Sequence, residues 1–143
     1  MSDHVYRVLY CSRNFIEGNA NEREIEISQI LATARANNGH ADVTGALLFT
    51  SGYFAQVLEG PRPAVEKIFE KIQRDGRHGD VTVLECGDAN ERDFPEWGMA
   101  YVEPPSQDQA KGLGAALDKA MQNPGAAGSG VLDLLRSLVL QED

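Results

Sequence analysis

The stretch Tyr53-Phe-Ala-Gln-Val-Leu-Glu-Gly60 is a short apolar run with a glutamine in its middle. Its side chains alternate as in a β-strand, so Gln56 shares one face with Phe54 and Leu58. A glutamine on an apolar face must find partners for its NH2 group and its carbonyl oxygen, or it costs about 1–3 kcal/mol. The pattern therefore predicts a buried strand in which Gln56 serves a specific partner.

The residues before this strand predict two more strands and a helix between them. Residues 5–12 alternate as a strand, and a polar loop over 13–20 follows. A helix then begins near Asn21, which stands three residues before a glutamate as in a capping box, and it ends at Gly39. Residues 43–50 predict the next strand, which a Ser-Gly turn joins to the glutamine strand as a hairpin.

The residues after the glutamine strand predict a second helix and two further strands. The helix opens at Gly60-Pro-Arg-Pro63 and ends near Asp75-Gly76, with apolar side chains at helical spacing. Residues 81–86 and 98–102 predict the last two strands. The order β-α-β-β-α-β-β predicts a ferredoxin-like α+β sandwich, a mixed, mostly antiparallel sheet of five strands with two helices on one face.

A change in composition at Pro104-Pro105 predicts a C-terminal helical appendage. Residues 107–122 have helical spacing, and 131–140 is apolar on more than one side. We expect a domain over residues 1–103 and an appendage over 104–143. Since both earlier helices cover one face of the sheet, the appendage should dock on the other face and contribute to a homodimer or partner interface.

Charge and cysteine content exclude several classes of protein. With 13 Lys+Arg against 22 Asp+Glu, the net charge of −9 argues against binding to nucleic acid or anionic membranes. The sequence shows neither a signal peptide nor an apolar run of about 20 residues. Cys11 and Cys86 lie in strand-like segments without metal-ligand spacing, which predicts free thiols in a reducing compartment. We expect a cytoplasmic protein without a metal site.

Four places combine a predicted buried position with unusual polarity, and each has an ordinary structural explanation. A tyrosine can sit at the edge of a core, asparagines are common where helices end, a buried amide can bond to nearby backbone, and a tryptophan beside a methionine can fill a core. The four places are Tyr10, Asn37-Asn38, Gln56, and Trp97 with Met99.

Together these places resemble the BLUF family, blue-light sensors that use flavin. Tyr10-Cys-Ser12 is similar to the Tyr-x-Ser of the family's first strand, and Asn38 stands six residues before Thr44-Gly45 as in its N-x5-TG-x-L spacing. Gln56 matches the glutamine of F-x-Q-V-L-E-G. Two further matches are Arg74-Asp-Gly-Arg77-His78, similar to R-D-x-R-H, and Phe94-Pro-Glu-Trp97-Gly-Met99 of the fifth-strand segment. The resemblance covers roughly residues 5–102.

The resemblance implies a blue-light photoreceptor that is not an enzyme. Tyr10 would donate an electron and a proton to the excited flavin, and Gln56 would change its hydrogen bond to the flavin C4 carbonyl, with Trp97 and Met99 moving or packing beside it. The apolar faces of the two predicted helices would form a slot for the flavin ring, and Ile30 of the first helix is a candidate for its wall. The expected cofactor is FAD, with FMN or riboflavin as alternatives, and its expected contacts are Tyr10, Ile30, Asn37, Asn38, Gln56, Asp75, Arg77, His78 and Met99. The expected output is a signal to an unidentified protein partner, from a short stand-alone chain that forms a homo-oligomer.

Two other functions compete with this interpretation. A small phosphatase of the acylphosphatase kind would need an anion-binding loop after the first strand. Arg13 and Asn14 stand there, but the glycine-rich run that would present backbone NH groups to a phosphate is missing. A light-insensitive flavin-binding adaptor is the other alternative, which illumination would distinguish.

Overall fold

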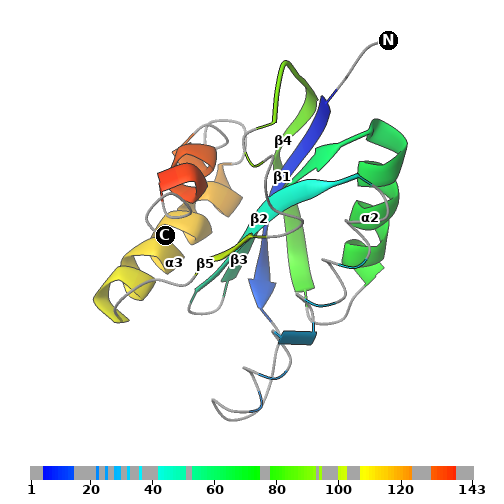
Figure 1. Cartoon of the computed structure of the whole chain (residues 1–143). Helices are drawn as coiled ribbons and strands as arrows, with labels where there is room; N and C mark the ends of the chain where they lie inside the picture. Colours follow the sequence, from blue (N-terminus) through cyan, green and yellow to red (C-terminus); the bar gives the residue numbers. More distant parts are fainter. Residues whose placement is uncertain are drawn as a thin grey trace.

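The strands and helices follow the predicted order. The computed structural model describes residues 5–14, 22, 25, 28, 29, 32, 36, 42–50, 53–74, 78–92, 94, 100–102, 107–123 and 130–137. Its elements are β1 (Val5–Asn14), β2 (Thr44–Thr50), β3 (Tyr53–Gly60), α2 (Arg62–Arg74), β4 (His78–Ala89), β5 (Ala100–Val102) and α3 (Gln107–Gln122) (Figure 1). A further helix covers residues 130–137.

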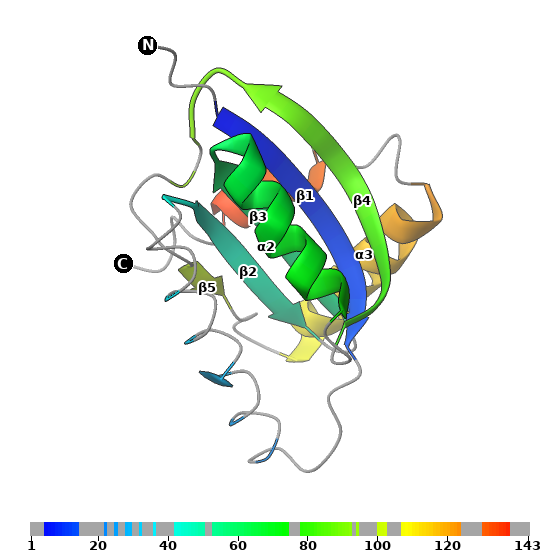
Figure 2. The same cartoon turned by 90° about the vertical axis from the view of Figure 1, so that its right-hand side faces the viewer.

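The sheet has the strand order β4-β1-β3-β2-β5. Neighbouring strands are antiparallel except for β5, which runs parallel to β2. β1 and β3 therefore lie inside the sheet, with a partner on each side. Figure 2 shows α2 crossing one face of the sheet, with α3 behind the other. This is the ferredoxin-like α+β arrangement that the sequence predicted.

Two separate cores lie on the two faces of the sheet. The core on the α2 face contains the buried side chains of Tyr6, Val8, Val43, Leu47, Phe54, Leu58, Val65 and Ile68. The core on the opposite face joins the sheet to α3 and to the helix at 130–137, and its fully buried members include Leu9, Val57, Leu117 and Leu135. The C-terminal helices therefore pack on the sheet face that α2 leaves open.

Two strands are longer than the apolar pattern predicted. The polar residues Arg13 and Asn14 were expected in a loop but belong to β1, and β4 extends over His78–Ala89 instead of residues 81–86. The reason is backbone pairing: β4 pairs with β1 from Val5↔Ala89 to Asn14↔His78, with register shifts along the way. Polar side chains continue a strand where the ladder has a partner, even though apolar alternation has ended.

Most of the predicted first helix lies outside the described residues. Six of its residues are described, and all six are helical and exposed. Five of the six recur every three or four residues, as on one outward face of a helix, and Ile25 among them is 59% exposed. β5 is described from Ala100 onward, so the predicted strand residues 98 and 99 also lie outside. Within the described part of the chain, no helix is long and apolar enough to cross a membrane.

Candidate functional site

Tyr10 and Gln56 lie opposite one another in the middle of the sheet. The β1–β3 register pairs them directly. Strand alternation places Gln56 on the face of Phe54 and Leu58, as predicted, and places Tyr10 on the face of Val8; all three apolar side chains belong to the α2-side core. The Tyr10 hydroxyl donates a hydrogen bond to Oε1 of Gln56. The tyrosine is 0% and the glutamine 3% exposed, so this polar pair is held away from water.

Aromatic and aliphatic groups enclose the pair. The ring of Phe69, from α2, lies 5.3 Å from the Tyr10 ring between centroids, at an interplanar angle of 48°. On the other side of β3, the register places Leu47 opposite Gln56. A tilted aromatic contact of this kind restricts the ring as well as burying it. The phenol and the amide are therefore positioned by strand pairing and packing together.

Gly45 allows β2 to approach the glutamine strand closely. A Cβ atom at Gly45 would lie 1.9 Å from the carbonyl oxygen of Val57, the residue next to Gln56. No side chain fits at that distance, so glycine is required at this position for the observed β2–β3 spacing. The Thr-Gly motif of the sequence thus has a structural role beside the Tyr10–Gln56 pair.

The other predicted site residues are not tested by the geometry. Ile30, Asn37, Asn38, Asp75, Arg77, Trp97 and Met99 lie outside the described residues. His78 is the first residue of β4 and pairs with Asn14, and its side chain is likewise outside. Of the predicted site, the structure therefore brings together the side chains of Tyr10 and Gln56.

A cavity of about 430 Å³ lies on the β4 side of α2. Phe69, which contacts Tyr10, forms part of its wall. Glu66 and Glu70 also line this cavity and form ion pairs with Arg62 and Arg74 of the same helix. None of the expected flavin contacts is among the lining residues, so we do not assign the flavin to this cavity. Its full lining is Tyr6, Val8, Glu66, Phe69, Glu70, Gln73, Val83 and Cys86.

At this cavity Tyr6 makes contacts that the sequence did not suggest. Burial, and then a hydrogen bond with Cys86, raise the pKa of its phenol. The guanidinium of Arg62 lies 4.9 Å from the centre of its ring, which is a cation–π contact. Tyr6 is therefore a neutral part of the wall at physiological pH.

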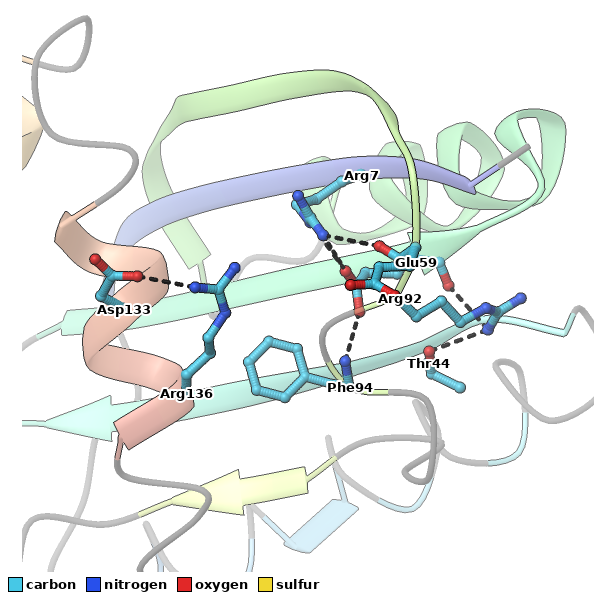
Figure 3. A network of polar contacts seen from close by, with 8 residues as sticks. Arg7, Thr44, Glu59, Arg92, Phe94, Asp133 and Arg136 are labelled. Carbon is cyan, nitrogen blue, oxygen red and sulfur yellow. Dashed lines mark hydrogen bonds and ion pairs between the residues drawn. The ribbon is translucent and has the colours of Figure 1, made fainter. Parts of the chain in front are cut away.

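Sequence reasoning missed a polar network on the opposite face of β3. Glu59 is fully buried, and its carboxylate accepts hydrogen bonds from the Arg7 side chain of β1 and from the backbone N–H of Phe94 (Figure 3). One signal could have found it. Glu59 alternates with the apolar Val57 on the face that Gln56 does not use, and a glutamate there needs a cation opposite, which Arg7 provides.

Comparison with known proteins identifies the family. The sequence model of BLUF, described as sensors of blue-light using FAD, matches residues 5–100. The chain belongs to the BLUF family. The photoactivated adenylate cyclase subunit beta of Euglena gracilis is 37% identical over 92 residues, which cover 59% of this chain and 11% of the relative. The blue light- and temperature-regulated antirepressor BluF of Escherichia coli (strain K12) is 35% identical over 94 residues, which cover 66% of this chain and 23% of that protein.

The fold is likewise that of a solved BLUF protein. The dark-state structure of BlrB has 26% sequence identity and a TM-score of 0.75, and the match covers 99% of both chains. The two curated relatives are much longer, since the matched regions make up only 11% and 23% of their lengths. What this chain shares with them is the BLUF domain.

The described residues offer no alternative metal centre. No group of three or more His, Cys, Asp and Glu side chains that could hold a metal ion occurs among them.

Proposed function

We propose that this BLUF chain is a blue-light photoreceptor that binds FAD non-covalently, with Tyr10 and Gln56 as its photoactive pair. The observation that carries the proposal is the buried hydrogen bond from the Tyr10 hydroxyl to Oε1 of Gln56, in a chain whose family comprises sensors of blue-light using FAD. FAD is preferred over FMN or riboflavin on the family description alone.

The surroundings of the pair fit a flavin. An isoalloxazine ring is a flat, largely apolar plate with a polar edge, and such ligands bind in apolar sites with a few placed polar groups. The α2-side core provides apolar side chains, and the Gln56 amide, next to the Tyr10 hydroxyl, has both donor and acceptor groups for the polar edge. We propose that Ile30, Asn37, Asn38, Asp75, Arg77, His78 and Met99 complete the contacts.

The residues of the pair have distinct roles. A bound flavin would supply light absorption and the acceptor for an electron. Tyr10 would be the donor of that electron and of its hydroxyl proton, which its hydrogen bond directs to the Gln56 oxygen. After both have returned to Tyr10, the Gln56 amide would be left rotated or tautomerised and would donate a different hydrogen bond. This change is worth a few kcal/mol at most, enough to bias a two-state element.

The decisive experiment is an absorption spectrum of the purified protein before and after blue light. We expect a yellow protein with a small, reversible red shift. A spectrum that only bleaches, or never moves, would reject the photoreceptor while leaving flavin binding intact, as in the adaptor alternative. A protein that stays colourless after flavin feeding would reject both.

Retention of the flavin tests the proposed role of Asn38. Asn38→Ala should chiefly lower the fraction of protein that keeps flavin through gel filtration, because the ring edge loses an amide partner. An unchanged flavin-to-protein ratio would remove Asn38 from the site.

Among the described residues, the geometry gives the phosphatase alternative no support. That reaction needs a loop after the first strand to hold an anion. Arg13 and Asn14 instead lie within β1, where Arg13 pairs with Tyr53 on one side and Gly79 on the other. We therefore propose a sensor and not an enzyme.

We further propose that residues 1–103 form the sensor and that residues 104–143 contribute to a homo-oligomer or partner interface. The packing of α3 and the helix at 130–137 on the sheet supports this role, because these helices share a core with β1 and β3. The signal would pass to a protein partner. We place the protein in the cytoplasm, since Cys11 and Cys86 are both free thiols.

A further inference from the structure

Glu59 is the only charged side chain that is fully buried among the described residues. A carboxylate in that position is costly unless it is paired and hydrogen-bonded. Arg7 meets Oε2 through Nε at 2.9 Å and Nη2 at 2.8 Å, which is a two-pronged ion pair. This pairing accounts for one carboxylate oxygen and leaves Oε1 for another donor.

That donor is a backbone group of the segment after β4. The N–H of Phe94 donates to Oε1 of Glu59 at 2.9 Å. The phenyl ring of Phe94 is 1% exposed and belongs to the core that the sheet shares with the C-terminal helices. Phe94 is thus fixed at its backbone by Glu59 and at its ring by the core.

Arg92 gives the same segment a second attachment. Its Nη1 donates to Oγ1 of Thr44 at 3.0 Å, and its Nη2 donates to the carbonyl oxygen of Asp42 at 2.8 Å. Arg7 adds a bond from Nη2 to the carbonyl oxygen of Glu91 at 3.2 Å. Glu91, Arg92 and Phe94 are therefore tied to β1 and β3 and to the start of β2 (Figure 3). We call Arg7, Glu59, Arg92 and Phe94 the Glu59 network.

The network stands at one end of a short stretch of chain that carries two photochemical candidates. Trp97 and Met99 fall within residues 95–99, directly after Phe94. The other end is also fixed, because β5 pairs with β2 in the register Ala46↔Ala100. Gln56 lies three residues before Glu59 on the same strand, and its side chain is on the opposite face. One strand therefore carries the proposed switch on one face and the anchor of the Trp97 segment on the other.

We propose that Glu59 is a positioning residue of the photoreceptor: its hydrogen bond to the Phe94 N–H fixes where the Trp97–Met99 segment begins. The consequence for the light response rests on the proposed function, whereas the positioning itself does not. We assign this bond to the dark state, so its loss lowers the free-energy cost of moving Phe94 away from Glu59. The lit state then returns more slowly.

A matched pair of double variants isolates this bond. Arg7→Met/Glu59→Gln removes the ion pair but keeps an amide oxygen for the Phe94 N–H, whereas Arg7→Met/Glu59→Met removes the acceptor as well. Neither variant leaves a buried charge unpaired, so the comparison is free of that penalty.

Two measurements on the purified full-length protein in the dark need neither photochemistry nor bound flavin. The first is hydrogen exchange at the Phe94 amide, and the second is acrylamide quenching of Trp97, the single tryptophan. We expect the Met variant to exchange and quench faster, by on the order of fivefold for one lost hydrogen bond. The Gln variant should stay within about twofold of the wild type on the same reasoning. Equal behaviour of the two variants would overturn the proposal and leave Glu59 a purely structural residue.

Dark recovery after blue light adds the functional readout. The Met variant should recover about fivefold more slowly than the Gln variant with a red shift of similar size. Equal recovery rates would show that the position of the segment does not affect the Gln56 switch.

If the wild type shows no red shift, the proposed function fails, but exchange and quenching still decide the positioning role. If the Met variant does not fold, Arg92→Gln provides a second test, because it removes the other attachment of this segment through a side chain that is 19% exposed. Trp97 quenching must then rise for the proposal to stand.

Discussion

At Gln56 the chain places an amide among apolar side chains on its own strand and on a neighbouring one. Phe54 and Leu58 flank it along β3, and Leu47 faces it from β2. Leucine would fill the same space with less desolvation cost. The sequence contains a glutamine instead, and the Tyr10 hydroxyl opposite supplies its partner. A polar pair built from two neighbouring strands fits the proposed switch, because turning the Gln56 amide exchanges its donor and acceptor ends beside the Tyr10 hydroxyl.

The first residue-scale prediction concerns that exchange. Gln56→Leu should keep the flavin but abolish the normal red shift, since leucine can neither accept from Tyr10 nor bond to a ring edge. Tyr10→Phe should do the same by removing the proton and the oxidisable phenol. Absorption spectra before and after blue light measure both. If both variants gave the full shift with normal recovery, the assignment of the switch would be wrong.

The second residue-scale prediction concerns the two thiols. Burial raises the pKa of Cys11 to about 12, whereas Cys86 is exposed. The thiolate is the reactive form, and at pH 8 a thiol of that pKa is ionised in about one molecule in 10⁴. A thiol reagent should therefore modify one cysteine of the native protein quickly and the second only after unfolding.

The same pKa shift has a consequence for stability. A raised pKa in the folded state contributes stability at low pH that is lost as pH rises, here from about 8.5, where the unfolded thiol ionises, towards about 12. The unfolding free energy of the wild type should fall faster over this range than that of Cys11→Ala. Cys86→Ser is the control for labelling, and no thiol should then react in the native state. Parallel pH profiles, or fast labelling of Cys86→Ser, would contradict the burial of Cys11.

At the scale of elements, the docking of α3 has one polar contact with a clear geometry. The Tyr53 hydroxyl, at the start of β3, donates to Oδ1 of Asp118 at 2.7 Å. Gln122, one turn further along α3, donates to Oδ2 at 3.1 Å. The hydrogen bond with Asp118 raises the pKa of Tyr53. The helix is thus fixed at the hairpin end of the sheet as well as by its apolar face.

Tyr53→Phe tests this contact. We expect the unfolding free energy in urea to fall by about 1 kcal/mol at pH 7, the usual worth of one such bond. Since the folded-state pKa of Tyr53 is raised, the stabilisation is present below pH ~10 and is lost as pH rises further. The difference between wild type and variant should therefore shrink above pH ~10. Asp118→Asn, which keeps an acceptor, should cost less. Equal stability of wild type and Tyr53→Phe at pH 7 would show that the bond contributes nothing to docking.

Elements with strong apolar periodicity were predictable from sequence, and their ends were not. α3 covers the predicted residues 107–122 because its apolar side chains recur at helical spacing up to its end. β4 was predicted too short because an edge strand needs apolar side chains only where it covers the core. The strand pattern marks Glu59 as a buried glutamate that needs a cation, but its contacts with residues 7 and 94 could not be assigned, since they depend on tertiary structure. The Tyr10–Gln56 contact followed from register once β1 and β3 were neighbours.

At the scale of the whole molecule, one sheet separates two cores that contain different residues. The α2 side holds Tyr10 and Gln56, and the other side holds Glu59, Phe94 and the C-terminal helices. β3 belongs to both, since alternate residues of one strand face opposite ways. A displacement of this strand therefore moves side chains on both faces. Whether the second face carries the output is testable by removing what covers it.

Deleting residues 104–143 exposes the sheet face that includes Ala46, Leu48 and Val57, each 0% exposed in the full chain. A contiguous apolar surface of this kind drives association. We expect the truncated protein to lose solubility or to change its oligomeric state, while the red shift persists because Tyr10 and Gln56 lie on the other face. Size-exclusion chromatography with light scattering, in the dark and under blue light, measures the assembly.

Leu135→Ala in the full-length chain is the milder companion to this deletion. It removes a fully buried side chain of the last helix and should cost about 2–5 kcal/mol of unfolding free energy without exposing the whole face. A loosened helix should then shift the oligomeric state in the same direction as the deletion, but by less.

If the truncated protein stays soluble and its assembly is the same in dark and light as that of the full chain, residues 104–143 do not carry the output signal. Among the described elements, α2 and the sheet edge at β4 are then the next candidates to carry the signal.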